Sequence, residues 1–308
     1  MESDGFLSRQ EVVCPPDLLR RAAGQGPAVT AIVGADYPVV LESVRQAQAV
    51  GIITPVLIGS RSGIEVAAQG MDWDVSGFEI VEASGEASAA QVGADLAFSG
   101  GVAMVMKGHV HSDTFMRPLL AKEGGIRGSG RLSHVFHMTV PASNQSIILT
   151  DCALNVAPNI RTRIAIVENA VTLAHKLGNA EPRVALLAAS ESVSEAMPVT
   201  QECEQIANHF STSELSAEVF GPLAFDNIVS TDAAKMKGID HPVAGGADVI
   251  VVPTIEAGNS LFKMMVYFMS ACAAGIVLGG KVPVLLTSRA DPPAARLASA
   301  ALGVISVH

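Results

Sequence analysis

Residues 28–35 read AVTAIVGA, a mostly apolar run that ends in a Gly-Ala pair. Similar short runs follow at residues 55–60 (PVLIGS), 78–83 (FEIVEA) and 102–108 (VAMVMKG), and Ala-rich stretches with a helical spacing of apolar residues separate them. Buried parallel strands have this composition, and helices connect one parallel strand to the next. The pattern therefore predicts an α/β fold with one strand in each run.

The alternation changes after Arg117. Residues 131–140 (RLSHVFHMTV) and 146–152 (SIILTDC) predict two strands that the short turn PASNQ joins into a hairpin. A hairpin in an otherwise alternating chain marks a boundary between two lobes, and 308 residues exceed the size at which single cores usually divide.

Strand and helix patterns then resume to the end of the chain. Strands are expected in RVALLAAS, before Gly221, in ADVIVVPT and in VPVLLTS, and helices around residues 202–210, from Gly258 and after Pro293. One helical crossover is expected to fill the whole interval between the last two strands.

The composition limits the partners of the protein. Hydrophobic residues make up 49% and charged residues 16% of the chain, which is typical of a compact globular enzyme. A net charge of −10 repels nucleic acids and anionic membranes, so neither is expected as a partner. An anionic ligand must therefore be met by a few local Arg, Lys and backbone N–H groups.

The cysteines and the apolar runs indicate a cytoplasmic location. Cys14, Cys152, Cys203 and Cys272 have no CxxC spacing, which fits neither a disulfide framework nor a zinc site. No apolar run approaches the roughly 18 residues of a membrane span, and the N-terminus lacks the apolar region of a signal peptide.

Two patterns that resemble ligand motifs are set aside. Residues 275–281 (GIVLGGK) have P-loop spacing, but Val282 follows instead of Ser or Thr, so a helix end and a turn are expected. The pairs His109/His111 and His134/His137 lack a carboxylate or cysteine to complete a ligand set, so no metal is expected.

Three polar clusters follow apolar strands, where ligands bind in open α/β sheets. In the first, Lys107, Ser112, Thr114 and Arg117 offer cations and hydroxyls beside a helix N-terminus, which suits an anion. The alternative is a solvated junction in which Ser112 or the following aspartate caps the helix.

The second cluster opens the helix after ADVIVVPT. Glu256, Gly258, Asn259 and Lys263 combine polar groups with a small residue that permits close backbone approach, and they are expected to contribute to substrate binding. The alternative is a capping carboxylate at Glu256 and a surface lysine.

The third cluster, Ser288, Arg289 and Asp291, ends the last apolar strand before two prolines that begin a helix. Arg289 offers a planar fork for phosphate, Asp291 a proton acceptor for a thiol, and Ser288 a donor to a carbonyl oxygen that gains charge. The alternative is a helix cap with a surface ion pair.

These segments resemble the phosphate acetyltransferase and phosphate butyryltransferase family. The C-terminal segments ADVIVVPTIEAGNSLFKMM and AAGIVLGGKVPVLLTSRAD carry the likeness, and KGHVHSDTFMRPLL, RLSHVFHM, LTDCALNVAP and GPLAFDNIVS follow the family order. The similarity extends from about Val102 to Leu302, and the first hundred residues are less distinctive.

The resemblance implies a two-lobed α/β/α subunit of three layers, like isocitrate and isopropylmalate dehydrogenases, with a cleft between the lobes and usually a homodimer. Residues 1–136 and 274–308 would form the first lobe and residues 137–273 the second. It also implies that acyl-CoA and phosphate are the substrates and that acyl phosphate and coenzyme A are formed from them. Coenzyme A would thus act as a substrate of the reversible reaction, and no cofactor would be tightly bound.

In this family the CoA thiol loses its proton to an aspartate and attacks the acyl phosphate carbonyl directly. Ser288 and Arg289 match the family's Ser-Arg pair, and Arg117 matches an arginine of an LRP-like segment. The acetyltransferase branch has a longer SRxxSDxD-like run where this chain reads SRADPPAAR, which leaves the base open; Asp291 is the carboxylate nearby.

Two other functions are compatible with the same layout: a noncatalytic acyl-CoA sensor and a nicotinamide-dependent oxidoreductase. The intact Ser-Arg-Asp cluster argues against the sensor, and the lack of a metal site or cofactor loop in the sequence argues against the oxidoreductase. Acetyl, propionyl and butyryl groups all remain possible, since one methylene changes pocket affinity by only about 1–3 kcal/mol.

Overall fold

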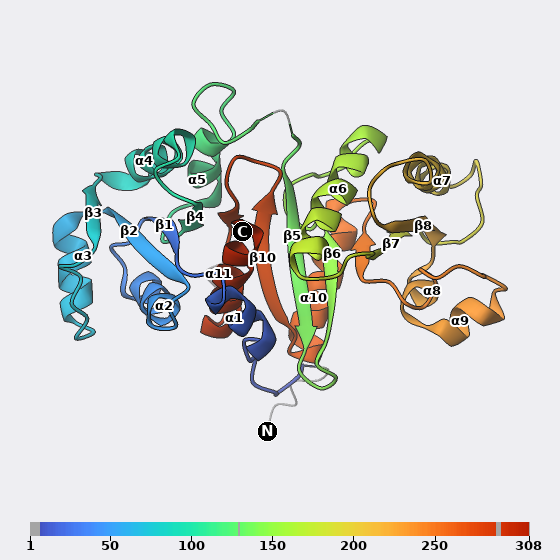
Figure 1. Cartoon of the computed structure of the whole chain (residues 1–308), viewed down its shortest axis with the longest axis horizontal. Helices are drawn as coiled ribbons and strands as arrows, with labels where there is room; N and C mark the ends of the chain where they lie inside the picture. The colour runs from blue at the N-terminus through green and yellow to red at the C-terminus, as the bar shows by residue number, and fades with distance from the viewer. Residues whose placement is uncertain (1–6, 129, 288–290, 308) are drawn as a thin grey trace. The chain divides into compact units, whose positions relative to one another are not determined.

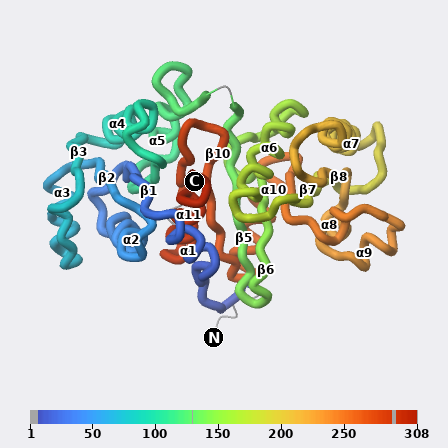
Figure 2. The backbone as a smooth tube through the Cα atoms, viewed as in Figure 1, coloured from blue at the N-terminus to red at the C-terminus, as the bar shows by residue number. Residues whose placement is uncertain are grey.

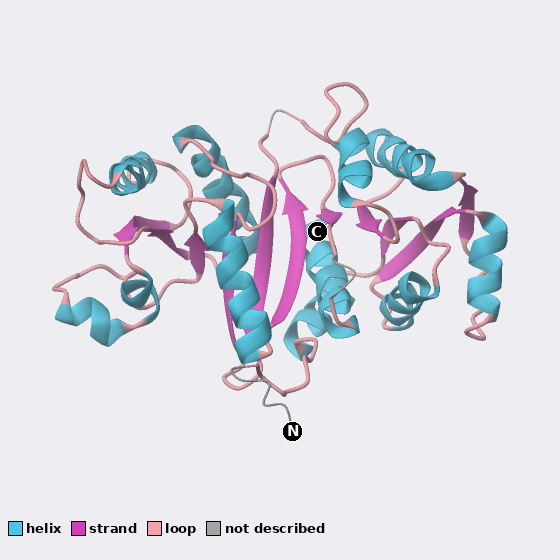
Figure 3. Ribbon diagram, turned by 180° about the vertical axis from the view of Figure 1, so that it is seen from behind, coloured by secondary structure: helices cyan, strands magenta, loops and turns pink. Residues whose placement is uncertain are grey.

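The computed structural model describes residues 7–128, 130–287 and 291–307. The chain divides into two compact units. The terminal unit comprises Val12–Leu132 and the residues from Ala274 onward, and the middle unit comprises Ser133–Ala273 together with the residues up to Glu11. Each unit is an α/β structure with helices on both sides of its strands (Figure 1, Figure 3).

The terminal unit has a mixed sheet in the order β3-β2-β1-β4-β11-β10. Neighbouring strands are parallel except β10, which is antiparallel to β11. The strands are β1 (Ala28–Val33), β2 (Ile53–Gly59), β3 (Glu79–Glu82), β4 (Met104–Lys107), β10 (Cys272–Leu278) and β11 (Val284–Leu285). The helices are α1 (Pro16–Ala23), α2 (Pro38–Ala49), α3 (Arg61–Gln69), α4 (Gly85–Ser99), α5 (Ser112–Leu119) and α11 (Pro293–Val307).

Both chain ends contribute to the core of the terminal unit. Helix α11 is almost entirely buried and packs on α1 and α2, so segments from opposite ends of the sequence lie side by side (Figure 2). Gly303 permits the close packing of α11 on strands β4 and β11, because a Cβ atom there would meet Leu285 Cδ1 and Met104 Sδ at 2.9 Å.

The middle unit has the strand order β5-β6-β9-β7-β8. The predicted hairpin is present as the antiparallel pair β5 (Ser133–Val140) and β6 (Gln145–Thr150), and the other pairings are parallel. The remaining strands are β7 (Arg183–Leu187), β8 (Glu218–Leu223) and β9 (Val249–Val251). The helices are α6 (Ile160–Lys176), α7 (Pro198–Phe210), α8 (Phe225–Val229), α9 (Thr231–Met236) and α10 (Ile255–Met269).

The expectation of one helix between the last two predicted strands is wrong. Helix α10 ends at Met269, Ser270 adopts a left-handed conformation with φ of 47°, and the buried strand β10 follows. Residues 275–278 of the P-loop-like run therefore lie in a strand instead of a helix end. The small residues of SACAAG have no strong local preference between helix and strand, and burial beside β11 selects the extended conformation.

The boundaries of the compact units differ from the expected lobes at two places. The middle unit begins at Ser133, where β5 starts, instead of residue 137. The first described residues also belong to it, because Ser8 N donates to Tyr267 O at 2.9 Å and Ser270 Oγ donates to Gln10 O at 2.8 Å. Among the described residues, no helix is long and apolar enough to cross a bilayer.

Candidate active site

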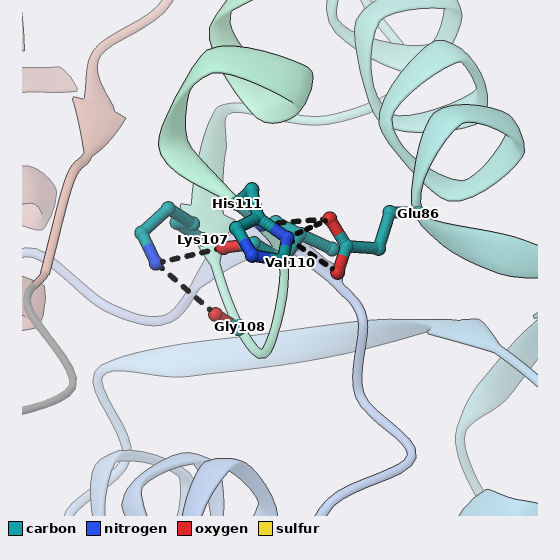
Figure 4. A network of polar contacts seen from close by, with 5 residues as sticks. All are labelled: Glu86, Lys107, Gly108, Val110 and His111. Atoms are coloured by element: carbon teal, nitrogen blue, oxygen red, sulfur yellow. Dashed lines mark hydrogen bonds and ion pairs between the residues drawn. The ribbon is translucent and has the colours of Figure 1, made fainter.

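Lys107 occupies the carboxyl end of β4 in the terminal unit. Its side chain is buried, and Nζ donates to the carbonyl oxygens of Val110 at 3.2 Å and Gly108 at 3.4 Å (Figure 4). Thr287 Oγ1 donates to the carbonyl oxygen of Lys107 at 3.3 Å. This bond places the residue directly before Ser288 against the first polar cluster.

Helix α5 carries the other three members of the first cluster. Phe115, Met116 and Leu119 form its buried face, so Ser112 and Arg117 are exposed and Thr114 is half-buried. No side chain caps this helix by a hydrogen bond, so the alternative of a Ser112 cap does not hold; the residue at the cap position is His111. The apolar positions thus determine which polar groups face solvent.

A pocket of about 220 Å³ lies at the carboxyl ends of β4 and β11. Its walls include Lys107 and Thr287, and two groups that the sequence did not suggest, Ser43 and Arg296. Arg296 Nη1 donates to the Ser43 hydroxyl and to Val39 O, each at 3.3 Å. The pocket therefore combines two cations with two hydroxyls, a set suited to an anion.

Of the third predicted cluster, Asp291 lies within the described residues and Ser288 and Arg289 lie outside them. Asp291 is half-buried and precedes Pro292, whose carbonyl oxygen accepts from Ala295 N and Arg296 N at the start of α11. Arg296 belongs to the segment SRADPPAAR, so its position in the first turn of α11 could have suggested it.

The second predicted cluster lies on α10 in the middle unit. Gly258 is buried, Asn259 is half-buried, and Glu256 and Lys263 are exposed. Hydrogen bonds from its own backbone N–H and from Thr254 hold the pKa of Glu256 below its ordinary value. That environment is the one expected of a carboxylate at a helix N-terminus.

The packing of α10 requires a glycine at position 258, which the sequence only suggested. A Cβ atom there would lie 2.8 Å from Asp151 O, 3.0 Å from Cys152 Cα and 3.0 Å from Cys152 Sγ. Helix α10 can therefore approach the turn after β6 only with a glycine at this position.

Asp151 holds the turn after β6 together by hydrogen bonds. It lies in the segment LTDCALNVAP, but it was not predicted as a site residue. Its buried carboxylate accepts from His134 N at 3.0 Å, from the backbone N–H groups of residues 153–155, and from Asn155 Nδ2 at 2.6 Å. The position of Asp151 directly after the apolar strand SIILT is the signal that could have identified it. Five hydrogen bonds compensate the burial of the charge.

The histidines do not gather around a metal. His109 stacks on Tyr37, with ring centroids 3.5 Å apart, and His111 pairs with Glu86. Burial lowers the pKa of His134 and of His137 to about 4. Within the described ranges, no three His, Cys, Asp or Glu side chains are grouped as metal ligands.

The comparisons with known proteins assign the family. A family model described as "Phosphate acetyl/butaryl transferase" matches residues 86–304. The chain is 41% identical over 289 residues to the phosphate acetyltransferase of Rickettsia prowazekii, covering 93% of this chain and 82% of that protein. It is 37% identical over 278 residues to the phosphate butyryltransferase of Clostridium acetobutylicum, covering 90% and 92%.

A solved structure agrees with this assignment. The branched-chain phosphotransacylase of Enterococcus faecalis V583 has a TM-score of 0.79 and 33% identity, covering 91% of this chain and 99% of that one. The family model, the relatives and this fold together define the class as a phosphate acyltransferase. The chain belongs to the phosphate acetyl/butyryl transferase family and is an enzyme of that family.

Proposed function

We propose that the protein transfers a short acyl group between coenzyme A and inorganic phosphate without a covalent acyl-enzyme. In one direction the CoA thiolate attacks the carbonyl carbon of the acyl phosphate and phosphate leaves; in the other, phosphate attacks the thioester carbonyl and the CoA thiolate leaves and is protonated. The observation that carries this proposal is the hydrogen bond from Thr287, the residue before Ser288 in the sequence, to the carbonyl oxygen of Lys107 at the cationic end of β4. A phosphate oxyanion needs several such donors at one place.

In the proposed mechanism, Ser288 and Arg289 bind the carbonyl and phosphate oxygens, and Asp291 takes the thiol proton. Lys107 and the α5 residues Ser112, Thr114 and Arg117 would bind anionic parts of the substrates. The burial of Lys107 supports this role, because the interaction of a cation with an anion strengthens where water is excluded.

The α10 residues would contribute polar groups to CoA binding. Gly258 lets the start of α10 lie close to the Asp151 turn, and Glu256, Asn259 and Lys263 supply polar groups on the first turns of the helix. The helix N-terminus adds a partial positive charge that suits an anionic ligand.

The acyl-CoA that the enzyme prefers as substrate distinguishes the acetyl branch of the family from the butyryl branch, and a comparison of rates measures it. Purified protein is incubated with acetyl-CoA, propionyl-CoA or butyryl-CoA, with and without phosphate, and thiol release is followed. Phosphate-dependent release is expected with at least one acyl-CoA, and the preferred chain gives the highest kcat/KM. Release that does not depend on phosphate, or no release with any of the three, contradicts the proposal.

The role of Asp291 has its own test. Asp291→Asn is expected to lower kcat by about 100-fold or more, with a change in CoA affinity of less than about twofold, because general-base catalysis contributes about 10²–10⁴. Turnover is measured at saturating substrates and CoA affinity by calorimetry. Unchanged turnover would assign the proton transfer to another group.

We also propose that the protein acts as a homodimer in the cytoplasm. The α10 surface, defined as Met264, Tyr267, Phe268 and Met269, exposes 41–55% of each residue. A groove of about 540 Å³ adjoins it, lined by Leu261, Met265 and residues of the β5–β6 hairpin. A two-fold interface needs one patch with both projecting and receiving parts, which this surface offers to a second copy. The four free, buried cysteines support a reducing compartment.

A further inference from the structure

The carboxylate of Glu86 binds His111 at two points. Glu86 Oε2 accepts from the backbone N–H of His111 at 2.8 Å, and His111 Nδ1 lies 2.8 Å from Oε2 and 2.9 Å from Oε1. Figure 4 shows the ring and the backbone of His111 both directed at this carboxylate. Because an ionised carboxylate only accepts hydrogen bonds, Nδ1 must carry the proton, which fixes the ring.

His111 is the residue at which α5 begins. It holds the cap position with ψ of 137°, and its own side chain makes no capping hydrogen bond to the helix. In a capping box, a glutamate within the helix binds the backbone N–H of the cap residue. Here Glu86 performs that part from the first turn of a different helix, α4.

The turn between β4 and α5 is held from its other side as well. Lys107 Nζ donates to the carbonyl oxygens of Gly108 and Val110 (Figure 4). A Cβ atom on Gly108 would lie 2.5 Å from Gly34 O, so the turn also packs directly on the backbone after β1. The link between Glu86 and His111 adds directed hydrogen bonds between this turn and α4, beside the packing of α4 on α5.

We propose that Glu86 is a positioning residue: through His111 it sets where α5 begins, and so where Ser112, Thr114 and Arg117 meet the phosphate. This inference rests on the proposed function, because it assumes that these α5 residues bind the phosphate. Glu86 itself does not contact the substrate. Its effect appears in phosphate binding and leaves CoA binding nearly unchanged.

The test compares Glu86→Ala with Asp95→Ala by kinetics in the direction of thiol release. Asp95 is an exposed carboxylate on the same helix whose side chain accepts from Gln91 Nε2 at 2.8 Å. Glu86→Ala is expected to raise KM for phosphate about five- to tenfold, since removing a cap interaction is worth about 1 kcal/mol. KM for the acyl-CoA is expected to change less than about twofold, and Asp95→Ala is expected to match wild type.

Two substitutions at His111 separate positioning from proton transfer. Asparagine can place an amide N–H near the position of Nδ1, so His111→Asn should keep KM for phosphate within about twofold of wild type. His111→Ala loses the ring contact but keeps the backbone N–H bond to Glu86, so it should raise KM for phosphate by less than Glu86→Ala does. A large loss of kcat in both His111 variants would instead assign proton transfer to the ring and overturn the positioning role.

A further control separates positioning from general destabilisation. The thermal midpoint of each variant is measured beside its kinetics, and the shift in KM for phosphate must persist at temperatures where every variant is folded. The inference is overturned if Glu86→Ala has the KM values of wild type, or if its KM for phosphate and its KM for the acyl-CoA rise by the same factor. Wild-type protein without phosphate-dependent thiol release would contradict the proposed function instead.

Discussion

At the scale of single residues, burial changes what a polar side chain does. His134 is enclosed beside Asp151, and Nδ1 of His134 and of His137 has no hydrogen-bond partner among the described residues. Burial lowers the pKa of both histidines, and the nearby Asp151 charge partly opposes this effect at His134. Both rings are therefore neutral in the folded protein at neutral pH.

This environment predicts that stability decreases in mild acid. The unfolded chain protonates its histidines near pH 6.5, whereas folded His137 does so near pH 4, so the unfolded state binds more protons between these values. The contribution of each neutral, buried histidine to the free energy of unfolding is fully present above pH 6.5 and is lost towards pH 4, by on the order of 3 kcal/mol per histidine.

Urea unfolding at pH 7, 5.5 and 4.5 measures this effect. His137→Gln is expected to lose less stability on acidification than wild type, and the exposed His209→Gln serves as the control. Identical pH dependence in wild type and His137→Gln would show that the ring is not held neutral.

At the scale of elements, close approach depends on single glycines. Helix α10 packs on β5 and β6, and Gly258 is its buried contact with the turn that Asp151 organises. The stacked rings of Phe136 and Phe262, 4.2 Å apart, continue the contact along the helix. Helix α10 therefore cannot move away from the Asp151 turn without also disturbing the stacked rings of Phe136 and Phe262.

Gly258→Ala is therefore expected to destabilise the protein by about 1–3 kcal/mol, because the added methyl group overlaps backbone atoms that cannot move independently. Gly77→Ala is the matched control, since a Cβ atom at Gly77 meets nothing within 4 Å. Denaturant unfolding gives both free energies. Equal stability of the two variants would mean that α10 is less closely packed than the distances indicate.

The hairpin and β10 show what local sequence can predict at this scale. The hairpin was predicted because PASNQ separates two β-branched runs, and pairing across a short turn is a local interaction. β10 was missed because CAAGIVL contains small residues whose helical and extended forms differ little in energy. Its conformation depends on pairing with β11 and on burial, which no local pattern encodes.

At the scale of the whole molecule, the α10 surface predicts association. A dimer is expected by light scattering, and replacing Met264 and Phe268 together with lysine is expected to shift the mass to that of a monomer, because two charges cannot be buried there without partners. Met236→Lys, another substitution of an exposed methionine, is the control. A monomeric wild type at micromolar concentration would contradict the homodimer.

The sequence by itself determined the α/β class, the hairpin, the order of the strands along the chain apart from β10, and the family. These depend on the local periodicity of apolar residues and on short motifs such as KGHVHSDTFMR and LLTSRAD. It also singled out Lys107 and Gly258, because each lies directly after or near the end of a buried strand.

The tertiary structure alone decided which distant residues meet. Arg296 reaches Ser43 and Val39, Glu86 binds His111, and the fully buried Arg163 of α6 donates to Cys203 Sγ at 3.3 Å. These partners are separated by 25 to 257 positions in the chain. Their contacts follow from the packing of helices on the sheet, and a local pattern carries no information on which helix faces which.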